Sequence, residues 1–182
     1  LLLERMYIGN RGIYWDRIPD FVAGLCGFSH GASGLGFIFL EAGHYLRNEA
    51  FYWLAKMAFE YESRYFNRKL GNWVDLRRHK TTKLYLDQQK NAFLNNNVEY
   101  FTKERYMNAW CHGAAGIGLA RLRGYELLKD TRYLNEAKIA AKTTAATDTH
   151  DEAYNNLMIY CHGNCGNADL FIESALRISE SR

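Results

Sequence analysis

Trp110-Cys111-His112-Gly113-Ala114-Ala115-Gly116 contains one of three places in this 182-residue sequence where a histidine runs directly into a glycine-x-x-glycine step. The other two are His30-Gly31-Ala32-Ser33-Gly34 and Cys161-His162-Gly163-Asn164-Cys165-Gly166. A single step of this kind is weak evidence, because glycine occurs wherever backbones come close or φ is positive. Three copies indicate an internal repeat, and a repeat brings distant segments to equivalent positions around one centre.

Apolar residues follow each glycine step at three- and four-residue spacing, which predicts helices. The predicted helices cover residues 34–46, 49–66, 117–128, 133–147 and 168–178. Asp130 is a candidate N-cap for the fourth of them. Each unit is then a glycine turn, a short inner helix and a longer outer helix, which is typical of an all-α array of helical hairpins.

The glycine steps lie 82 and 50 residues apart, counted from Gly31 to Gly113 and from Gly113 to Gly163. The longer interval predicts an insertion, which we place at residues 67–106. We expect it to be mostly loop, with a short strand around Lys83 to Leu86. A loop of this length in a compact domain is usually functional or mobile.

Composition places the chain among globular proteins. Apolar residues make up 48% of it, and its length suffices for one domain with a core. Lys and Arg exceed Asp and Glu by three (23 against 20), and these charges are scattered, so neither nucleic acid nor an anionic membrane is implied as a partner. No apolar run approaches the roughly eighteen residues of a membrane-spanning helix, and the N-terminal residues lack the order of a signal peptide. We expect a cytoplasmic protein.

Four cysteines are present, and two of them stand directly before a histidine and a glycine step. In a chain without an export signal, reduced thiols fit better than two disulfides. Cys111 with Cys161 and His162 offers three ligands, and three protein ligands with one open position are typical of catalytic zinc. The alternative is that both cysteines are small buried hydrophobic residues. Their matching placement favours a zinc site, because ligands from separate loops need the same local geometry to converge.

His30 stands at the start of the first glycine step, where it could be a metal ligand, a general acid or base, or a core histidine. We favour the acid or base, because zinc with two thiolates and an imidazole gains most from an open position for substrate. His112 follows a ligand directly, so we expect it behind the ligands or facing solvent. We assign Cys165 to packing. Three other histidines are assigned to the surface: His44, His79 and His150.

The motifs together resemble a known family. The segments Gly27-Phe28-Ser29-His30-Gly31, Trp110-Cys111-His112-Gly113-Ala114-Ala115-Gly116-Ile117-Gly118 and Cys161-His162-Gly163-Asn164-Cys165-Gly166-Asn167 resemble, in order and spacing, the lanthionine synthetase C-like cyclases. The Trp-Cys-His-Gly form and the intervening Asn72-Trp73-Val74-Asp75-Leu76-Arg77 are most similar to the cyclase half of the bifunctional class II lanthipeptide synthetases. The likeness runs from about Phe21 to Asn167.

The resemblance implies an α/α toroid of helical hairpins with catalytic zinc at its centre. Cys111, Cys161 and His162 fall on the family's three zinc ligands, and His30 falls on the histidine proposed as general acid or base. The implied reaction adds a peptide cysteine thiolate to the β-carbon of a dehydroalanine or dehydrobutyrine in the same peptide. A thioether ring forms, and the resulting enolate takes a proton at its α-carbon. Stand-alone members often carry arginine four residues before the first cysteine ligand, where this chain has Met107.

The chain begins without methionine and stops directly after a helical pattern. We therefore expect residues 1–182 to be part of a single cyclase-like domain, truncated at both ends, from a parent protein that could also be a dehydratase. The implied partner is a dehydrated, cysteine-containing precursor peptide, and an export transporter is a further one. If the protein works with an export transporter, it could be located peripherally at the inner face of the membrane.

Three alternative functions compete with the lanthionine cyclase. A related protein could use the same zinc to add glutathione or another thiol to modified proteins. A non-catalytic zinc scaffold could bind peptides, which Cys165 as a fourth ligand would favour. A glycoside hydrolase on a similar toroid would need two carboxylates across a cleft. Its candidates share no repeat position and leave the cysteines unexplained; they are Asp75, Asp148, Asp151 and Glu152.

Overall fold

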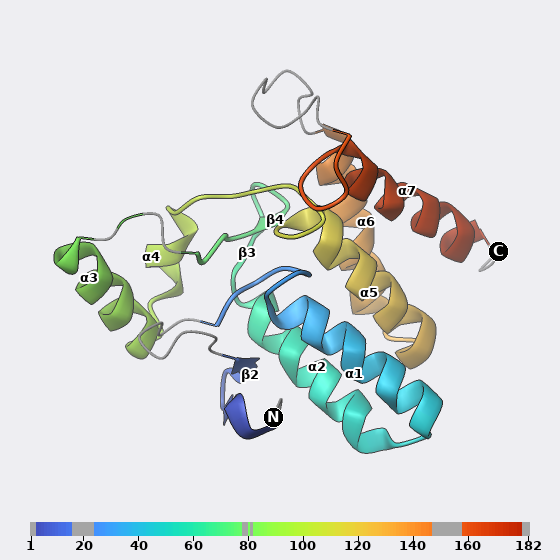
Figure 1. Ribbon diagram of the computed structural model, residues 1–182, viewed down its shortest axis with the longest axis horizontal. Coiled ribbons are helices and arrows are strands. Elements are labelled where there is room, and N and C mark those ends of the chain that lie inside the picture. The colour runs from blue at the N-terminus through green and yellow to red at the C-terminus, as the bar shows by residue number, and fades with distance from the viewer. Residues whose placement is uncertain (1–2, 16–23, 78–79, 81, 147–157, 180–182) are drawn as a thin grey trace.

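The computed structural model describes residues 3–15, 24–77, 80, 82–146 and 158–179. Two antiparallel helical hairpins form its main body (Figure 1). The first consists of α1 (Ala32–Leu46) and α2 (Glu49–Ser63), and the second of α5 (Ala114–Leu128) and α6 (Thr131–Ala146). A further helix, α7 (Asn164–Ser179), packs against α5 and α6. The predicted pairing of helices is confirmed.

Each helix after a glycine step begins within that step. α1, α5 and α7 start directly after Gly31, Gly113 and Gly163, two to four residues earlier than predicted. The step is therefore the first turn of the helix. At the start of α6, Asp130 Oδ1 accepts a hydrogen bond of 2.9 Å from the Arg132 N–H, as the N-cap prediction requires.

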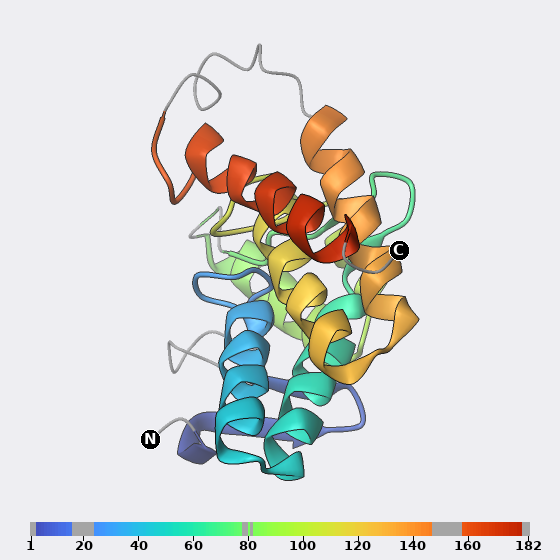
Figure 2. The same cartoon turned by 90° about the vertical axis from the view of Figure 1, so that its right-hand side faces the viewer.

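The three helices that follow glycine steps lie side by side, in the order α1, α5, α7 (Figures 1 and 2). Their partners α2 and α6 form a second row along one side (Figure 2). This is the inner and outer arrangement expected of a hairpin array. The described part of the chain forms an open row and no closed ring.

The expectation of an all-α fold is wrong in detail, because two short antiparallel β-hairpins accompany the helices. After a 3-10 turn at Leu3–Arg5, β1 (Met6–Gly9) pairs with β2 (Gly12–Trp15), and β2 packs against α2. β3 (Phe66–Asn67) pairs with β4 (Asn72–Trp73). Both hairpins turn through a glycine with positive φ, Gly12 in the first (+98°) and Gly71 in the second (+60°). Glycine adopts that backbone region without steric cost.

The insertion at 67–106 is more ordered than predicted. α3 (Lys83–Leu94) and α4 (Val98–Thr102) occupy most of its second half. The predicted strand around Lys83 to Leu86 is wrong, because α3 buries residues at helical spacing: Tyr85, Gln89, Ala92 and Phe93. The helices lie to one side of the two hairpins (Figure 1). None of the described helices is both long and apolar enough to cross a bilayer.

A charged network crosses the core between the two hairpins. Arg121 and Glu62 are both fully buried and form an ion pair of 3.0 Å. Arg121 also pairs with Glu136 on α6 at 2.5 Å, and its guanidinium lies 4.1 Å from the centre of the Phe59 ring. Buried charges persist only when they are paired and hydrogen-bonded. The network therefore fixes the position of α5 relative to α2.

Candidate metal centre and active site

The three glycine steps have the same atomic environment. A Cβ atom on the second glycine of each step would overlap the carbonyl oxygen six residues earlier in the chain. The pairs are Gly34 with Phe28, Gly116 with Trp110, and Gly166 with Tyr160. The repeat inferred from the sequence is therefore also a repeat in backbone packing, and glycine is required because the backbones touch.

Main-chain hydrogen bonds connect the three turns in a row. The Cys111 N–H donates to the Cys161 carbonyl at 3.0 Å, while the Cys111 carbonyl accepts from the Phe28 and Ser29 N–H groups, both at 3.1 Å. Cys111 thus lies between the equivalent residues of the other two repeats. The backbone itself brings the first and third motifs to the second.

The thiols of Cys111 and Cys161 are close enough to influence each other's ionisation. Cys111 is buried, whereas Cys161 is exposed. Burial, the hydrogen bond with the Cys161 thiol and the charge of Cys161 together raise the pKa of Cys111 to about 11. The positive charge of Arg77 opposes this shift. Two of the three predicted ligands therefore meet.

The third predicted ligand, His162, follows Cys161 directly and is half-buried. Among the described residues, no group of three His, Cys, Asp or Glu side chains has the spacing of a metal site. The structure therefore brings together two of the predicted ligands, Cys111 and Cys161, which we call the thiol pair. Its chemistry suits zinc, since sulfur ligands select that ion and the pair lies next to an imidazole in the chain. A cation would also offset the burial that keeps the Cys111 thiol protonated.

The rings of His30 and His112 lie together. Their ring centroids are 5.9 Å apart, and His30 is exposed whereas His112 is only 2% exposed. The prediction that His112 could face solvent is wrong. Gly27, with φ of +112°, allows the first turn to approach: a Cβ there would lie 3.1 Å from His112 Nδ1. The first turn thus covers His112.

The environment of His112 keeps its ring neutral at pH 7. Burial, together with the positive charge of Arg77, lowers its pKa to about 4. Nδ1 lies 3.3 Å from the carbonyl oxygen of Cys26, which only accepts hydrogen bonds. The neutral ring therefore carries its proton on Nδ1. His30 consequently has an uncharged neighbour.

Glu62 holds the first turn on both sides of His30. Its Oε1 accepts a 2.7 Å hydrogen bond from the Gly27 N–H, and its Oε2 accepts from the Ser33 hydroxyl and from Arg121. Burial raises the pKa of Glu62, and the charge of Arg121 opposes this rise. The sequence analysis did not assign Glu62 or Arg121 to the site. One sequence feature could have indicated them: each is a charged residue on the apolar face of a predicted helix, and the two charges have opposite signs.

Other sequence assignments have mixed outcomes. Cys165 is exposed, and its thiol donates to the Met158 carbonyl at 3.5 Å, so its assignment to packing is wrong. His44 is exposed, as expected. The remaining candidates lie outside the described residues: His79, His150, Asp148, Asp151 and Glu152.

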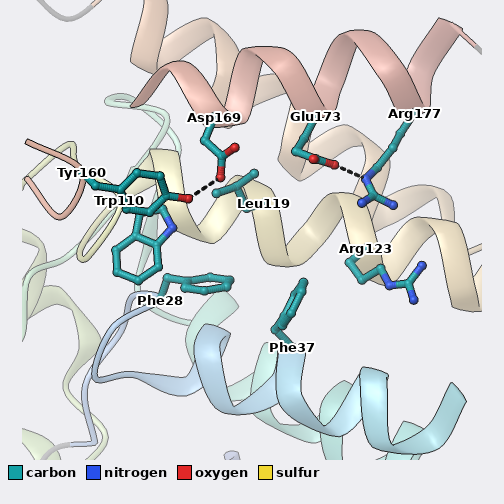
Figure 3. Close-up of a pocket in the computed structure, with 9 residues that line it drawn as sticks. All are labelled: Phe28, Phe37, Trp110, Leu119, Arg123, Tyr160, Asp169, Glu173 and Arg177. Atoms are coloured by element: carbon teal, nitrogen blue, oxygen red, sulfur yellow. Dashed lines mark hydrogen bonds and ion pairs between the residues drawn. The ribbon is translucent and has the colours of Figure 1, made fainter. Parts of the chain in front are cut away.

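A cavity of about 250 Å³ lies next to the turns, between α1, α5 and α7 (Figure 3). Phe28, Trp110 and Tyr160 form one wall, with ring centroids 5.1 and 5.2 Å apart along the row. Each of these rings directly precedes Ser29, Cys111 or Cys161 in the chain. The rings of this wall therefore belong to the same three turns that carry Ser29, Cys111 and Cys161. Its other side carries charged residues of α7, among them Asp169, which accepts from the Tyr160 hydroxyl at 2.6 Å (Figure 3).

Comparison with known proteins identifies the family of the chain. No curated protein matches the chain. Residues 9–182, which include all three glycine steps and the thiol pair, match the lanthionine synthetase C-like protein family. Because this match covers nearly the whole sequence and the motifs converge in space, the chain belongs to the lanthionine synthetase C-like family.

Proposed function

We propose that the protein is a zinc-dependent lanthionine cyclase of lanthipeptide biosynthesis, of the class II type, acting on a dehydrated precursor peptide. The observation that carries the proposal is the juxtaposition of Cys111 and Cys161, which stand at equivalent positions of two repeats and are joined by a main-chain hydrogen bond of 3.0 Å. Sulfur ligands from separate loops are typical of zinc sites in proteins without disulfides. Membership of the family supports the same activity.

Cys111, Cys161 and His162 would hold the zinc ion. When bound, zinc would supply the stabilisation that makes a cysteine thiol of the substrate a thiolate at neutral pH. Three protein ligands leave one position for that substrate. The proposal includes an α/α toroid of which α1, α5 and α7 are part of the inner row, and a cytoplasmic location.

The residues around the thiol pair fit the rest of the reaction. As the substrate sulfur bonds to the β-carbon, the electron pair of the double bond moves towards the carbonyl group, and an enolate forms. His30 is exposed and lies 5.9 Å, centre to centre, from the neutral ring of His112. His30 is the exposed ring of this pair, and it donates a proton to the α-carbon of the enolate.

The proposal is tested by metal analysis and by mass spectrometry of the peptide product. In the full-length protein, Cys111→Ala should lose most of its zinc and its cyclase activity, because two ligands hold zinc poorly against water. Cys165→Ala is the control, since this exposed thiol lies on the Met158 carbonyl, and it should keep both. Unchanged zinc in Cys111→Ala would contradict the ligand assignment, and zinc loss in Cys165→Ala would favour a closed, structural site.

The product distinguishes the other thiol-adding function. An intramolecular ring leaves the peptide mass unchanged and removes a thiol that alkylating reagents would otherwise cap. Addition of glutathione raises the mass and leaves the peptide cysteines open to capping. Adduct without ring formation would replace the cyclase proposal by the glutathione one.

A further inference from the structure

The segment around Arg77 is attached to the loop that precedes Cys111. The Asp75 N–H donates to the Arg105 carbonyl at 2.8 Å, and the Asn72 side-chain amide donates to the Met107 carbonyl at 3.1 Å. The Met107 carbonyl in turn lies against Gly113, where a Cβ atom would overlap it. Residues 72–77 therefore have a defined position relative to the thiol pair, although they come from the insertion.

Asp75 holds the Arg77 guanidinium in a fixed orientation. Arg77 Nε donates to Asp75 Oδ1 at 2.9 Å and Arg77 Nη2 to Asp75 Oδ2 at 2.6 Å, while the Arg77 backbone N–H donates to Oδ1 at 3.1 Å. Arg77 Nη2 also lies 3.1 Å from the sulfur of Met107. Burial raises the pKa of Asp75, but the hydrogen bonds and charge of Arg77 outweigh this and lower it overall. The pair is therefore ionised at neutral pH.

The two partners differ in exposure. The Asp75 side chain is 1% exposed, whereas the Arg77 side chain is 37% exposed. A buried carboxylate thus anchors a cation that solvent, and so a ligand, can reach. Arg77 Nη2 lies 3.1 Å from the sulfur of Met107, four residues before Cys111. The guanidinium therefore lies against the loop that leads into the Cys111 turn.

We propose that Arg77 is the oxyanion-binding residue of the cyclisation; this rests on the proposed function. The substrate class is an α,β-unsaturated amide, namely the dehydroamino acid within the peptide. When the carbon–sulfur bond forms, the π electrons of the Cα=Cβ bond move into the bond between Cα and the carbonyl carbon. The negative charge gathers on the carbonyl oxygen. An N–H of Arg77 donates to that oxygen until His30 protonates the α-carbon and the carbonyl re-forms.

Arginine suits this role for two reasons. Its guanidinium stays protonated at neutral pH, and it presents several N–H donors in one plane. A donor fixed in advance needs no reorganisation when charge develops, which is why such groups accelerate reactions more than mobile ones do. The buried Asp75 supplies that fixation.

The test compares Arg77→Gln with Arg132→Gln in the full-length, zinc-loaded protein. Arg132 forms the same Asp-x-Arg arrangement with Asp130, at 2.7 Å, but its side chain is 69% exposed and it lies at the start of α6. Arg77→Gln should lower kcat by about 10²- to 10³-fold, the usual effect of removing one oxyanion donor. KM and zinc content should stay close to wild type. Arg132→Gln should leave all three unchanged.

Two further variants separate a chemical from a structural role. Arg77→Lys should recover part of kcat, because it restores the charge without the planar fork. Asp75→Asn should fall between Arg77→Gln and wild type, because the guanidinium remains but loses its anchor. Binding of a dehydrated peptide whose cysteines are replaced by alanine should be the same within a few-fold in all four variants.

Several outcomes would overturn the assignment. A wild-type kcat in Arg77→Gln, a rise in KM alone, or a loss of zinc would each show that Arg77 does not act on the developing charge. A wild-type protein that forms no thioether would contradict the proposed function itself. An active wild type with an equally active Arg77→Gln would contradict only the role of Arg77.

Discussion

The backbone N–H of Cys111 donates a hydrogen bond of 3.0 Å to the carbonyl oxygen of Cys161. This bond joins the two cysteine motifs through the main chain, so the position of each thiol does not depend on the other side chain. Substitution of either cysteine should therefore remove a ligand without separating the loops. Effects of such variants on zinc and activity can then be attributed to the missing sulfur.

The first prediction concerns His30. His30→Asn should keep its zinc but cyclise about 10²-fold or more slowly, because a positioned proton donor contributes on that scale. Dehydrated peptide with thiols that an alkylating reagent can cap should accumulate. The measurement is mass spectrometry of quenched reactions, together with metal analysis.

His44→Asn is the matched control, since His44 is exposed on α1 and should affect neither property. Loss of zinc in His30→Asn would make His30 a metal ligand. A wild-type rate would mean that water or another residue supplies the proton.

The second prediction concerns the close packing of the glycine steps. Gly116→Ala places a Cβ atom onto the Trp110 carbonyl and within 2.7 Å of the Phe28 Cβ, so backbone must move. We expect a loss of about 3 kcal/mol in the free energy of unfolding, at the upper end of costs for overpacked sites. Denaturant unfolding monitored by circular dichroism measures it.

Gly9→Ala is the control, because a Cβ there meets no atom within 4 Å. Its free energy of unfolding should stay within about 0.5 kcal/mol of wild type. Equal stability of the two variants would show that the turns are not in contact in solution.

The third prediction is a pH dependence of stability in the metal-free protein. The unfolded chain protonates His112 near its ordinary pKa of 6.5, whereas the folded protein does so only at about pH 4. Between these values the unfolded state binds more protons, so the free energy of unfolding falls as pH falls. We expect a loss of about 1–2 kcal/mol between pH 6.5 and pH 5 from this residue.

His112→Asn should lose this part of the pH dependence, because asparagine keeps a donor for the Cys26 carbonyl and does not titrate. Urea unfolding of both proteins at a series of pH values gives the comparison. Parallel curves for wild type and variant would show that burial does not shift the titration of His112.

The helices and the repeat were predictable from the sequence because both are local patterns. Apolar spacing and the glycine steps located α1, α2, α5, α6 and α7 within a few residues. Capping at Asp130 was predictable for the same reason, since a cap acts on the N–H groups that follow it directly. α3 was not predicted, because few of its residues are apolar and its helical spacing becomes plain only from the residues that the fold buries.

The sequence by itself determined the array of hairpins, the family resemblance and the identity of the candidate ligands, since these depend on residue types at short or repeated spacing. Only the tertiary structure decided that Cys111 and Cys161 lie side by side, that His112 is buried and that Arg77 lies against Met107. Each of these depends on segments distant in the chain: Gly27 covers His112, and the insertion carries Arg77. The burial of a side chain and the charges near it depend on the segments that pack against it in the folded protein. The periodicity of residues along the chain does not reveal which segments those are.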